Sequence, residues 1–223
     1  MKSRYASISD LAARIPVFPL PGALLLPRTD LPLQIFEPRY LAMVNDALAG
    51  DRLIGMIQPE AEVTGTLVPE GVALHRVGCV GRITAFSETP DERLMVTLSG
   101  ICRFRVAGET KVKTPYRQVK ADYAPFAADL EAAEGAAGVD RAHLLKTFRA
   151  FLEAHDMSAD WREVDGASTE ALVNTLSLLA PYGPRDKQAL LEAPDLAARA
   201  EVLVALTEMS LARARGDGPP SLQ

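Results

Sequence analysis

Residues 15–55 read IPVFPLPGALLLPRTDLPLQIFEPRYLAMVNDALAGDRLIG, and this stretch decides the fold because two different patterns follow each other in it. Prolines interrupt the first half so often that no helix can run through it, which leaves short extended segments and turns. From Glu37 onward, Pro38 suits the first position of a helix, apolar residues recur at helical spacing, and Gly50 ends the pattern. We therefore predict a strand, a loop, a second strand and a helix, followed by a strand over Leu53–Gln58.

The order of short motifs in this stretch resembles the start of the Lon N-terminal domain family, the substrate-binding domain that precedes the ATPase and protease parts of Lon proteases. The family pattern has a strand ending in PL, a PG turn, a strand reading PL-x-IFE, and PRY at the start of a helix. The matching residues are Phe18-Pro19-Leu20, Pro21-Gly22, Pro32-Leu33-Gln34-Ile35-Phe36-Glu37 and Pro38-Arg39-Tyr40. The resemblance continues at residues 93–106, RLMVTLSGICRFRV, and at residues 173–206, so it covers nearly the whole chain.

The resemblance implies an α+β fold, with an N-terminal PUA-like small β-barrel that carries one inserted helix, followed by a C-terminal α-helical bundle. A composition change supports a division, because residues 121–138 contain no Lys or Arg. We expect a barrel over residues 1–123, a connector over 124–138, a helical part over 139–215 and a disordered tail over 216–223.

The pattern of apolar residues predicts the elements of both halves. In the barrel we expect a meander of strands over Val77–Ser87, Leu94–Ser99 and Ile101–Ala107, with Gly100 between the last two, and a final strand over Tyr116–Tyr123. In the helical part we expect four helices, marked by Leu144–Leu152, by Ser168 with Glu170 in the first turn, by Pro184, and by Val202–Met209.

The composition is that of a globular protein, since 223 residues with 48% hydrophobic and 24% charged side chains can bury a core. A net charge of −5 disfavours nucleic acid and anionic membrane surfaces as partners. No segment reaches the roughly 18 to 20 apolar residues of a membrane helix, and prolines break the helical region that a signal peptide needs. We therefore expect a cytoplasmic protein.

The two cysteines, Cys79 and Cys102, lie in strand-like runs and do not form a disulfide framework of the secreted type. We expect buried free thiols, and a disulfide between adjacent strands stays open as an alternative.

The sequence contains none of the catalytic motifs of Lon proteases. There is no GxxxxGK[ST] phosphate loop and no region resembling the Ser-Lys protease domain of Lon. His75, His143 and His155 are scattered, and the cysteines lack CxxC spacing, so no metal site is indicated. We expect a protein that is not an enzyme, has no cofactor, and represents a stand-alone form of the family without ATPase or protease domains.

The leading hypothesis, implied by the resemblance, is a module that binds unfolded or exposed polypeptide segments as a substrate-recognition, adaptor or chaperone-like protein. A protease or chaperone would then be a partner, and the protein would be able to form homo-oligomers. Extended peptides dock on strand edges through backbone hydrogen bonds, with pockets that select side chains. The candidates for this surface are Leu20, Leu24, Leu25 and Leu26. Core packing is an equal alternative for the last three, although three consecutive residues of one strand cannot all face inward.

The most specific motif holds residues that we interpret as structural: Pro19, Phe36, Glu37, Pro38, Arg39 and Tyr40. A glutamate at a helix start helps to satisfy free backbone amides, and an arginine one turn in can anchor that carboxylate or loop carbonyls.

A basic run over residues 93–120, interrupted by one acid, Glu109, supports an alternative function. Arg103 and Arg105 lie two apart on a predicted strand and therefore share a face, and Lys113 follows them. Such a stripe is able to contact RNA phosphates, and PUA-like folds include RNA binders. The other interpretation is a solvated strand face whose charges discourage aggregation.

Overall fold

The computed structural model describes residues 5–61, 68–69, 71–90, 93–131 and 136–214. Contacts divide the chain into two units: unit 1 is Met1–Ala132 with Tyr182–Leu191, and unit 2 is Ala133–Pro181 with Glu192–Gln223. The expected tail over residues 216–223 and part of the expected connector lie outside the described residues.

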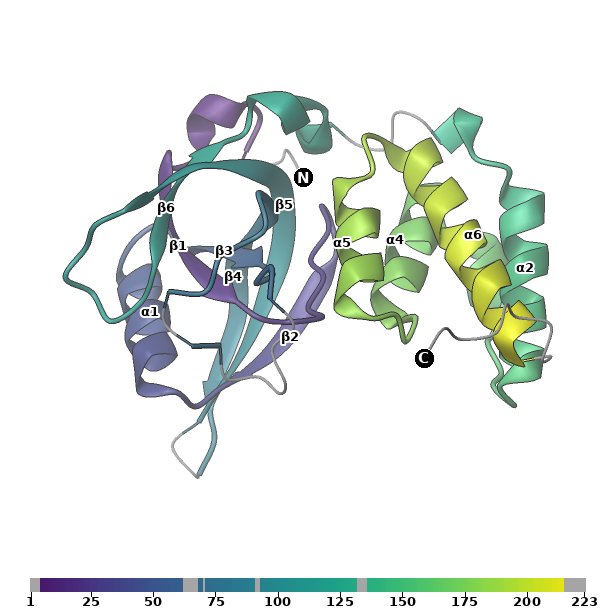
Figure 1. Ribbon diagram of the computed structural model, residues 1–223, viewed down its shortest axis with the longest axis horizontal. Coiled ribbons are helices and arrows are strands. Elements are labelled where there is room, and N and C mark those ends of the chain that lie inside the picture. The colour runs from purple at the N-terminus through teal and green to yellow at the C-terminus, as the bar shows by residue number, and fades with distance from the viewer. Residues whose placement is uncertain (1–4, 62–67, 70, 91–92, 132–135, 215–223) are drawn as a thin grey trace. The chain divides into compact units, whose positions relative to one another are not determined.

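Unit 1 is built on one six-stranded sheet (Figure 1). The strands are β1 (Arg14–Pro19), β2 (Asp30–Ile35), β3 (Leu53–Ile57), β4 (Val77–Glu88), β5 (Leu94–Thr110) and β6 (Gln118–Asp122). Their order is β2-β5-β4-β3-β1-β6, and β6 also pairs with β5, so that every strand except β2 belongs to a closed ring of pairings. β1 and β3 run parallel, while the other pairs are antiparallel. The expected α+β class is therefore correct.

Strand β5 is continuous, and the predicted break of the meander at Gly100 is wrong. The first part of β5 pairs with β2 and its last part with β6. One continuous strand therefore forms hydrogen bonds with both of these strands. Gly100 has a different role, since a Cβ atom there would lie 2.0 Å from the carbonyl oxygen of Leu26. The Gly100 N–H also donates to the Thr29 carbonyl at 2.8 Å, so the main chains touch at this point.

The interior of the ring is filled by apolar side chains around Phe104, which is fully buried. Gly55 and Gly78 make room for it, because a Cβ atom on either would come within 2.9 Å of the Phe104 ring. Buried Ile15 and Val119 face each other on β1 and β6 and complete this part of the core. β3 is buried along its whole length, whereas residues 32–35 of β2 alternate between exposed and buried.

Helix α1 (Pro38–Ala49) begins and ends as predicted, with Pro38 in its first turn and Gly50 as the C-cap residue. Its buried residues are Tyr40, Met43, Val44 and Ala47, whose spacing forms one helical face against the sheet. Two short 3-10 helices, η1 (Ile8–Asp10) and η2 (Ala124–Leu130), lie against each other in the same unit.

Helix α5 (Pro184–Glu192) belongs to unit 1 up to Leu191, although the helices that precede and follow it belong to unit 2. Buried glutamines attach it: Gln58 donates to the Pro184 carbonyl at 3.0 Å, and Gln188 donates to the Val77 carbonyl at 3.1 Å. Unit 1 therefore takes in η2 and α5, beyond the barrel limit at residue 123 expected from sequence.

Unit 2 is helical and contains η3 (Ala136–Gly138), α2 (Arg141–Ala154), α3 (Trp161–Gly166), α4 (Thr169–Leu179) and α6 (Leu196–Ala214). Ser168 caps α4 as predicted, by accepting a hydrogen bond from the Ala171 N–H at 3.1 Å. Helix α6 packs against both α2 and α4, and a buried hydrogen bond of 3.0 Å joins Arg199 to Asn174. The short helix α3 was not predicted, because its six residues span too few turns to reveal a helical period.

Candidate functional site

Strand β2 lies at the end of the strand order, so only one of its edges is paired, with residues Leu94–Ser99 of β5. Within the described residues its other edge has no strand partner. Leu33 and Ile35 point into the core, whereas Pro32 and Gln34 are exposed. The edge therefore offers backbone hydrogen-bonding groups beside an apolar layer, which is the geometry that an added strand requires.

A small pocket lies along β2. Its volume is about 150 Å³, and its lining is mostly apolar, from Phe18, Leu20, Pro32, Leu33, Gln34, Ile35, Phe36, Glu37 and Tyr40. The rings of Phe18 and Tyr40 lie 4.2 Å apart, and burial raises the pKa of the Tyr40 hydroxyl above its ordinary value. The pocket is thus large enough for one apolar side chain and holds its tyrosine neutral.

Two exposed apolar side chains extend this surface. Phe36, directly after β2, is 49% exposed, and Met95 on β5 is 39% exposed. Met95 pairs with Gln34, so these two share one face, and Phe36 lines the pocket together with Gln34. The Arg93 guanidinium lies 5.8 Å from the centre of the Phe36 ring. We call β2 with its pocket, Phe36 and Met95 the β2 edge site.

The charged pair at the end of this site is bound within the protein. Arg39 Nη2 lies 2.8 Å from Glu37 Oε2 and also donates to the Val68 carbonyl at 2.9 Å. The Arg39 guanidinium lies 4.6 Å from the centre of the Tyr40 ring. Glu37 is the N-cap residue of α1, but its side chain makes no capping bond. The predicted contact of Glu37 with helix amides is therefore wrong, and the predicted contact with Arg39 is present.

The three consecutive leucines expected at the peptide surface are buried, with Leu24 2%, Leu25 1% and Leu26 0% exposed. The expectation that not all three face inward is wrong because they lie in a loop rather than in a strand, so side-chain alternation does not apply. The loop lies tightly on the sheet, since a Cβ atom at Gly81 would be 2.8 Å from Leu25 Cδ2. Leu20 is half-buried and lines the pocket at β2.

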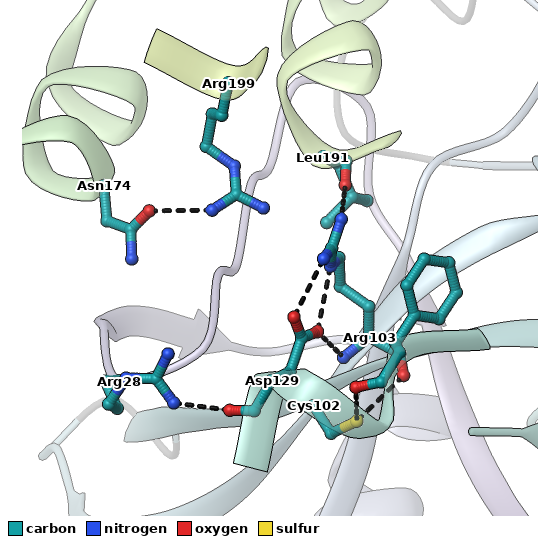
Figure 2. A network of polar contacts seen from close by, with 8 residues as sticks. Arg28, Cys102, Arg103, Asp129, Asn174, Leu191 and Arg199 are labelled. Carbon is teal, nitrogen blue, oxygen red and sulfur yellow. Dashed lines mark hydrogen bonds and ion pairs between the residues drawn. The ribbon is translucent and has the colours of Figure 1, made fainter. Parts of the chain in front are cut away.

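Arg103, expected on an RNA-binding stripe, is 3% exposed and forms a buried ion pair with Asp129 of η2 (Figure 2). Its Nε and main-chain N–H both donate to Asp129 Oδ2 at 2.9 Å, and Nη2 donates to Oδ1 at 2.8 Å. Nη1 donates to the Leu191 carbonyl of α5 at 3.1 Å. Arg28 donates to the Asp129 carbonyl, so both ends of this residue are held. Arg103 is thus satisfied internally and does not present its charge to a ligand.

The other two residues of that stripe are exposed. Arg105 lies on β5, two residues after Arg103, and Lys113 lies in the loop between β5 and β6. Arg103 and Arg105 differ in their surroundings although they lie two residues apart on one strand. Arg103 is bound by η2 and α5, whereas Arg105 is exposed.

Both cysteines are free and buried, as expected. The Cys102 thiol contacts the carbonyl oxygens of Arg103 and Phe126, at 3.2 and 3.3 Å. Burial first, and then the Asp129 carboxylate, raise the pKa of the Cys102 thiol to about 12, which leaves it protonated and unreactive near neutral pH. Across the residues the structure describes, no three His, Cys, Asp or Glu side chains gather in a metal-binding arrangement, and none of the helices is long and apolar enough to cross a membrane.

Sequence reasoning located the motif around β2 and expected docking on a strand edge, but it did not identify β2 as an edge strand or Met95 as an exposed residue. One signal was available: Pro32 lies inside an apolar strand pattern, and proline is tolerated in sheets mainly on edge strands. No comparable signal marked Met95, because an apolar residue in a strand is usually buried.

Known proteins are similar to this chain in sequence. Residues 14–208 match the family model of the ATP-dependent protease La (LON) substrate-binding domain. Lon protease 2 of Myxococcus xanthus is 26% identical over 208 residues, which make up 88% of this chain and 24% of that protein. Lon protease of Dictyoglomus thermophilum is 30% identical over 113 residues, which make up 51% of this chain and 14% of that protein. The chain therefore spans about a quarter or less of the length of these relatives.

Solved structures share the fold. The Lon N-terminal domain protein from Xanthomonas campestris superposes with a TM-score of 0.60 at 22% identity. The N-terminal domain of a Mycobacterium avium complex Lon protease superposes with a TM-score of 0.65 at 17% identity. Each comparison covers 87% of this chain and 98% of the other chain. At these identities the likeness concerns the fold alone.

Proposed function

This chain belongs to the ATP-dependent protease La (LON) substrate-binding domain family, and from that premise we propose that it recognises polypeptides destined for Lon-type proteolysis. The ligand in this proposal is an unfolded or exposed segment in extended conformation. The protein itself acts as a binding module without catalytic activity of its own, in the manner of an adaptor or a chaperone-like protein.

The observation that carries the proposal is the free edge of β2 with an apolar pocket beside it. An extended segment that adds to β2 gains main-chain hydrogen bonds, which do not depend on its sequence, while a pocket selects one side chain of every two. Main-chain pairing of this kind suits a module that accepts many different unfolded segments.

The chemistry of the site favours apolar side chains. Glu37 and Arg39 neutralise each other at its end, and Arg93 beside Phe36 adds a cation. Phe36 and Met95 supply an aromatic and a flexible thioether surface, and methionine adapts to differently shaped ligands. Segments of this composition are normally buried, so their exposure marks an unfolded protein.

The wider setting of this function follows the family. We place the closed ring of strands among PUA-like small barrels, and the protein in the cytoplasm, where its two free thiols stay reduced. A protease or chaperone that receives the bound polypeptide is the partner that the proposal requires, and a homo-oligomer would present several edges to one chain.

The proposal is tested by binding of a fluorescent peptide, taken from an unfolded substrate and rich in apolar residues, to the wild type and to Phe36→Ser and Met95→Ser variants. Each variant should bind at least about tenfold more weakly, because burial of such a side chain contributes roughly 1.5–3 kcal/mol. Leu179→Ser is the matched control, since Leu179 is 76% exposed and belongs to unit 2, whereas β2 belongs to unit 1. Equal affinity of the wild type and both edge variants would refute the proposal.

A further inference from the structure

The outer face of the sheet contains two cations directly opposite each other. Arg14 on β1 pairs in register with Lys120 on β6, and both side chains are exposed. Like charges directly opposite each other on neighbouring strands are destabilising. The pair therefore lowers the stability of the fold. The peptide site proposed above gives no reason for keeping two cations at these positions.

A third cation adjoins this pair. Arg105 on β5 is exposed and pairs with Asp122, which lies two residues after Lys120 on the same face. Asp122 is an acid on this surface, and its Oδ1 accepts a hydrogen bond from the Ala124 N–H at 3.0 Å. In the part of the chain that the structure describes, the three cationic side chains form no ion pair or hydrogen bond.

On β5, the residue opposite Lys120 is a glycine, so no side chain lies beside the lysine there. Gly108 of β5 pairs with Lys120, and a Cβ atom there would meet nothing within 4 Å. Its φ angle is not positive, so neither packing nor backbone conformation requires glycine. A strand glycine of this kind, here beside a register shift, leaves the main chain open to close approach by a ligand.

We propose that this basic face, formed by Arg14, Lys120 and Arg105 around Gly108, binds the phosphate backbone of single-stranded RNA. The face lies on strands other than β2 and is independent of the peptide function proposed above. A phosphodiester chain carries an anion at every nucleotide and meets the cations together, whereas a polypeptide does so only where acidic residues cluster. The whole-chain charge of −5 does not decide this, because binding depends on the local arrangement of charges.

The surroundings of the basic face indicate how RNA binds. The neighbouring tyrosines Tyr116 and Tyr123 are buried, so they offer no platform for base stacking. Lys111 and Lys113 are exposed in the loop that joins β5 to β6. Contacts are therefore to phosphates, and binding is independent of base sequence.

The sequence predicted Arg103, Arg105 and Lys113 as RNA-binding residues. Of these, Arg105 and Lys113 are exposed. Arg103 leaves the set because Asp129 holds it in the interior. Arg14 enters it through the pairing of β1 with β6, which joins residues far apart in sequence.

The test is binding of fluorescein-labelled polyuridine to the full chain between about 20 and 200 mM salt. Phosphate contacts by three cations give a slope of about −2 for log K against log salt, and Arg14→Gln or Lys120→Gln should each reduce it by about 0.7. Asp122→Asn should strengthen binding, an effect that a merely structural role would not produce. Lys146→Gln, which removes an exposed charge in unit 2, is the control and should leave the slope unchanged.

Three results would overturn the proposal: no binding at about 20 mM salt, the same slope in all variants, or equal loss in the control. Competition by polyglutamate as strong as that by RNA would also overturn it and assign the face to acidic polypeptides. Lys120→Gln relieves the repulsion from Arg14, so this variant should fold at least as well as the wild type, and its result does not depend on a damaged fold.

Discussion

Arg103 and Asp129 form a buried ion pair, with Arg103 Nη2 2.8 Å from Asp129 Oδ1 and two further bonds to Oδ2. The pair joins β5 to η2, and Nη1 of Arg103 joins both to α5 by donating to the Leu191 carbonyl. Three segments distant in sequence are therefore fixed to one side chain.

Removal of one partner should destabilise unit 1 strongly. Asp129→Ala leaves a buried guanidinium without its counter-ion, so we expect the free energy of unfolding to fall by about 3–5 kcal/mol. Glu109→Ala, which breaks the partly exposed pair with Arg117, should cost less than about 1 kcal/mol. Urea denaturation followed by far-UV circular dichroism measures both, and equal losses in the two variants would contradict this assignment.

Gly100 and Gly108, both on β5, should respond differently to alanine. Gly100→Ala places a Cβ atom 2.0 Å from the Leu26 carbonyl oxygen, so the backbone must move, at a cost of about 1–3 kcal/mol or more. Gly108→Ala meets nothing within 4 Å and should change stability little. Thermal unfolding of the two variants measures the difference, and a stable Gly100→Ala protein would show that the loop over residues 20–29 is not held as described.

Stability should fall at alkaline pH. The pKa is raised to about 12 for both Cys102 and Tyr116, from ordinary values near 9 and 10, with burial as the main cause in each case. Above about pH 9 the unfolded chain releases protons that the folded chain retains, so the free energy of unfolding falls as pH rises toward 12.

Cys102→Ala isolates one part of this alkaline effect. The variant lacks the thiol that titrates, so its free energy of unfolding should fall less steeply between about pH 9 and pH 12. Urea denaturation of both proteins at several pH values gives the two slopes. Identical slopes would mean that the Cys102 thiol does not contribute.

Much of the fold could be predicted from the sequence because local rules decided it. Pro38 and Gly50 mark the ends of α1, and Ser168 marks the start of α4, since capping depends on near neighbours in sequence. The family motif around β2 carried the resemblance, and residues 14–208 match the family model.

The parts that sequence did not predict depend on contacts between distant segments. Gly100 resembled a turn but is the place where the Leu26 main chain touches β5. Arg103 resembled an exposed strand arginine, and its partner Asp129 lay in a segment interpreted as a connector. Leu24–Leu26 were expected in a loop, but the alternation rule of a strand was applied to them, and in a loop it does not leave one of them exposed.

The most direct test of the peptide-recognition account is amide hydrogen exchange of the full chain with and without a saturating unfolded polypeptide. An added strand on the free edge protects backbone N–H groups, so exchange should slow over residues 30–35 of β2. Exchange in the α2 and α6 helices of unit 2 should stay the same. Unchanged exchange over residues 30–35 while the polypeptide is bound would contradict the account.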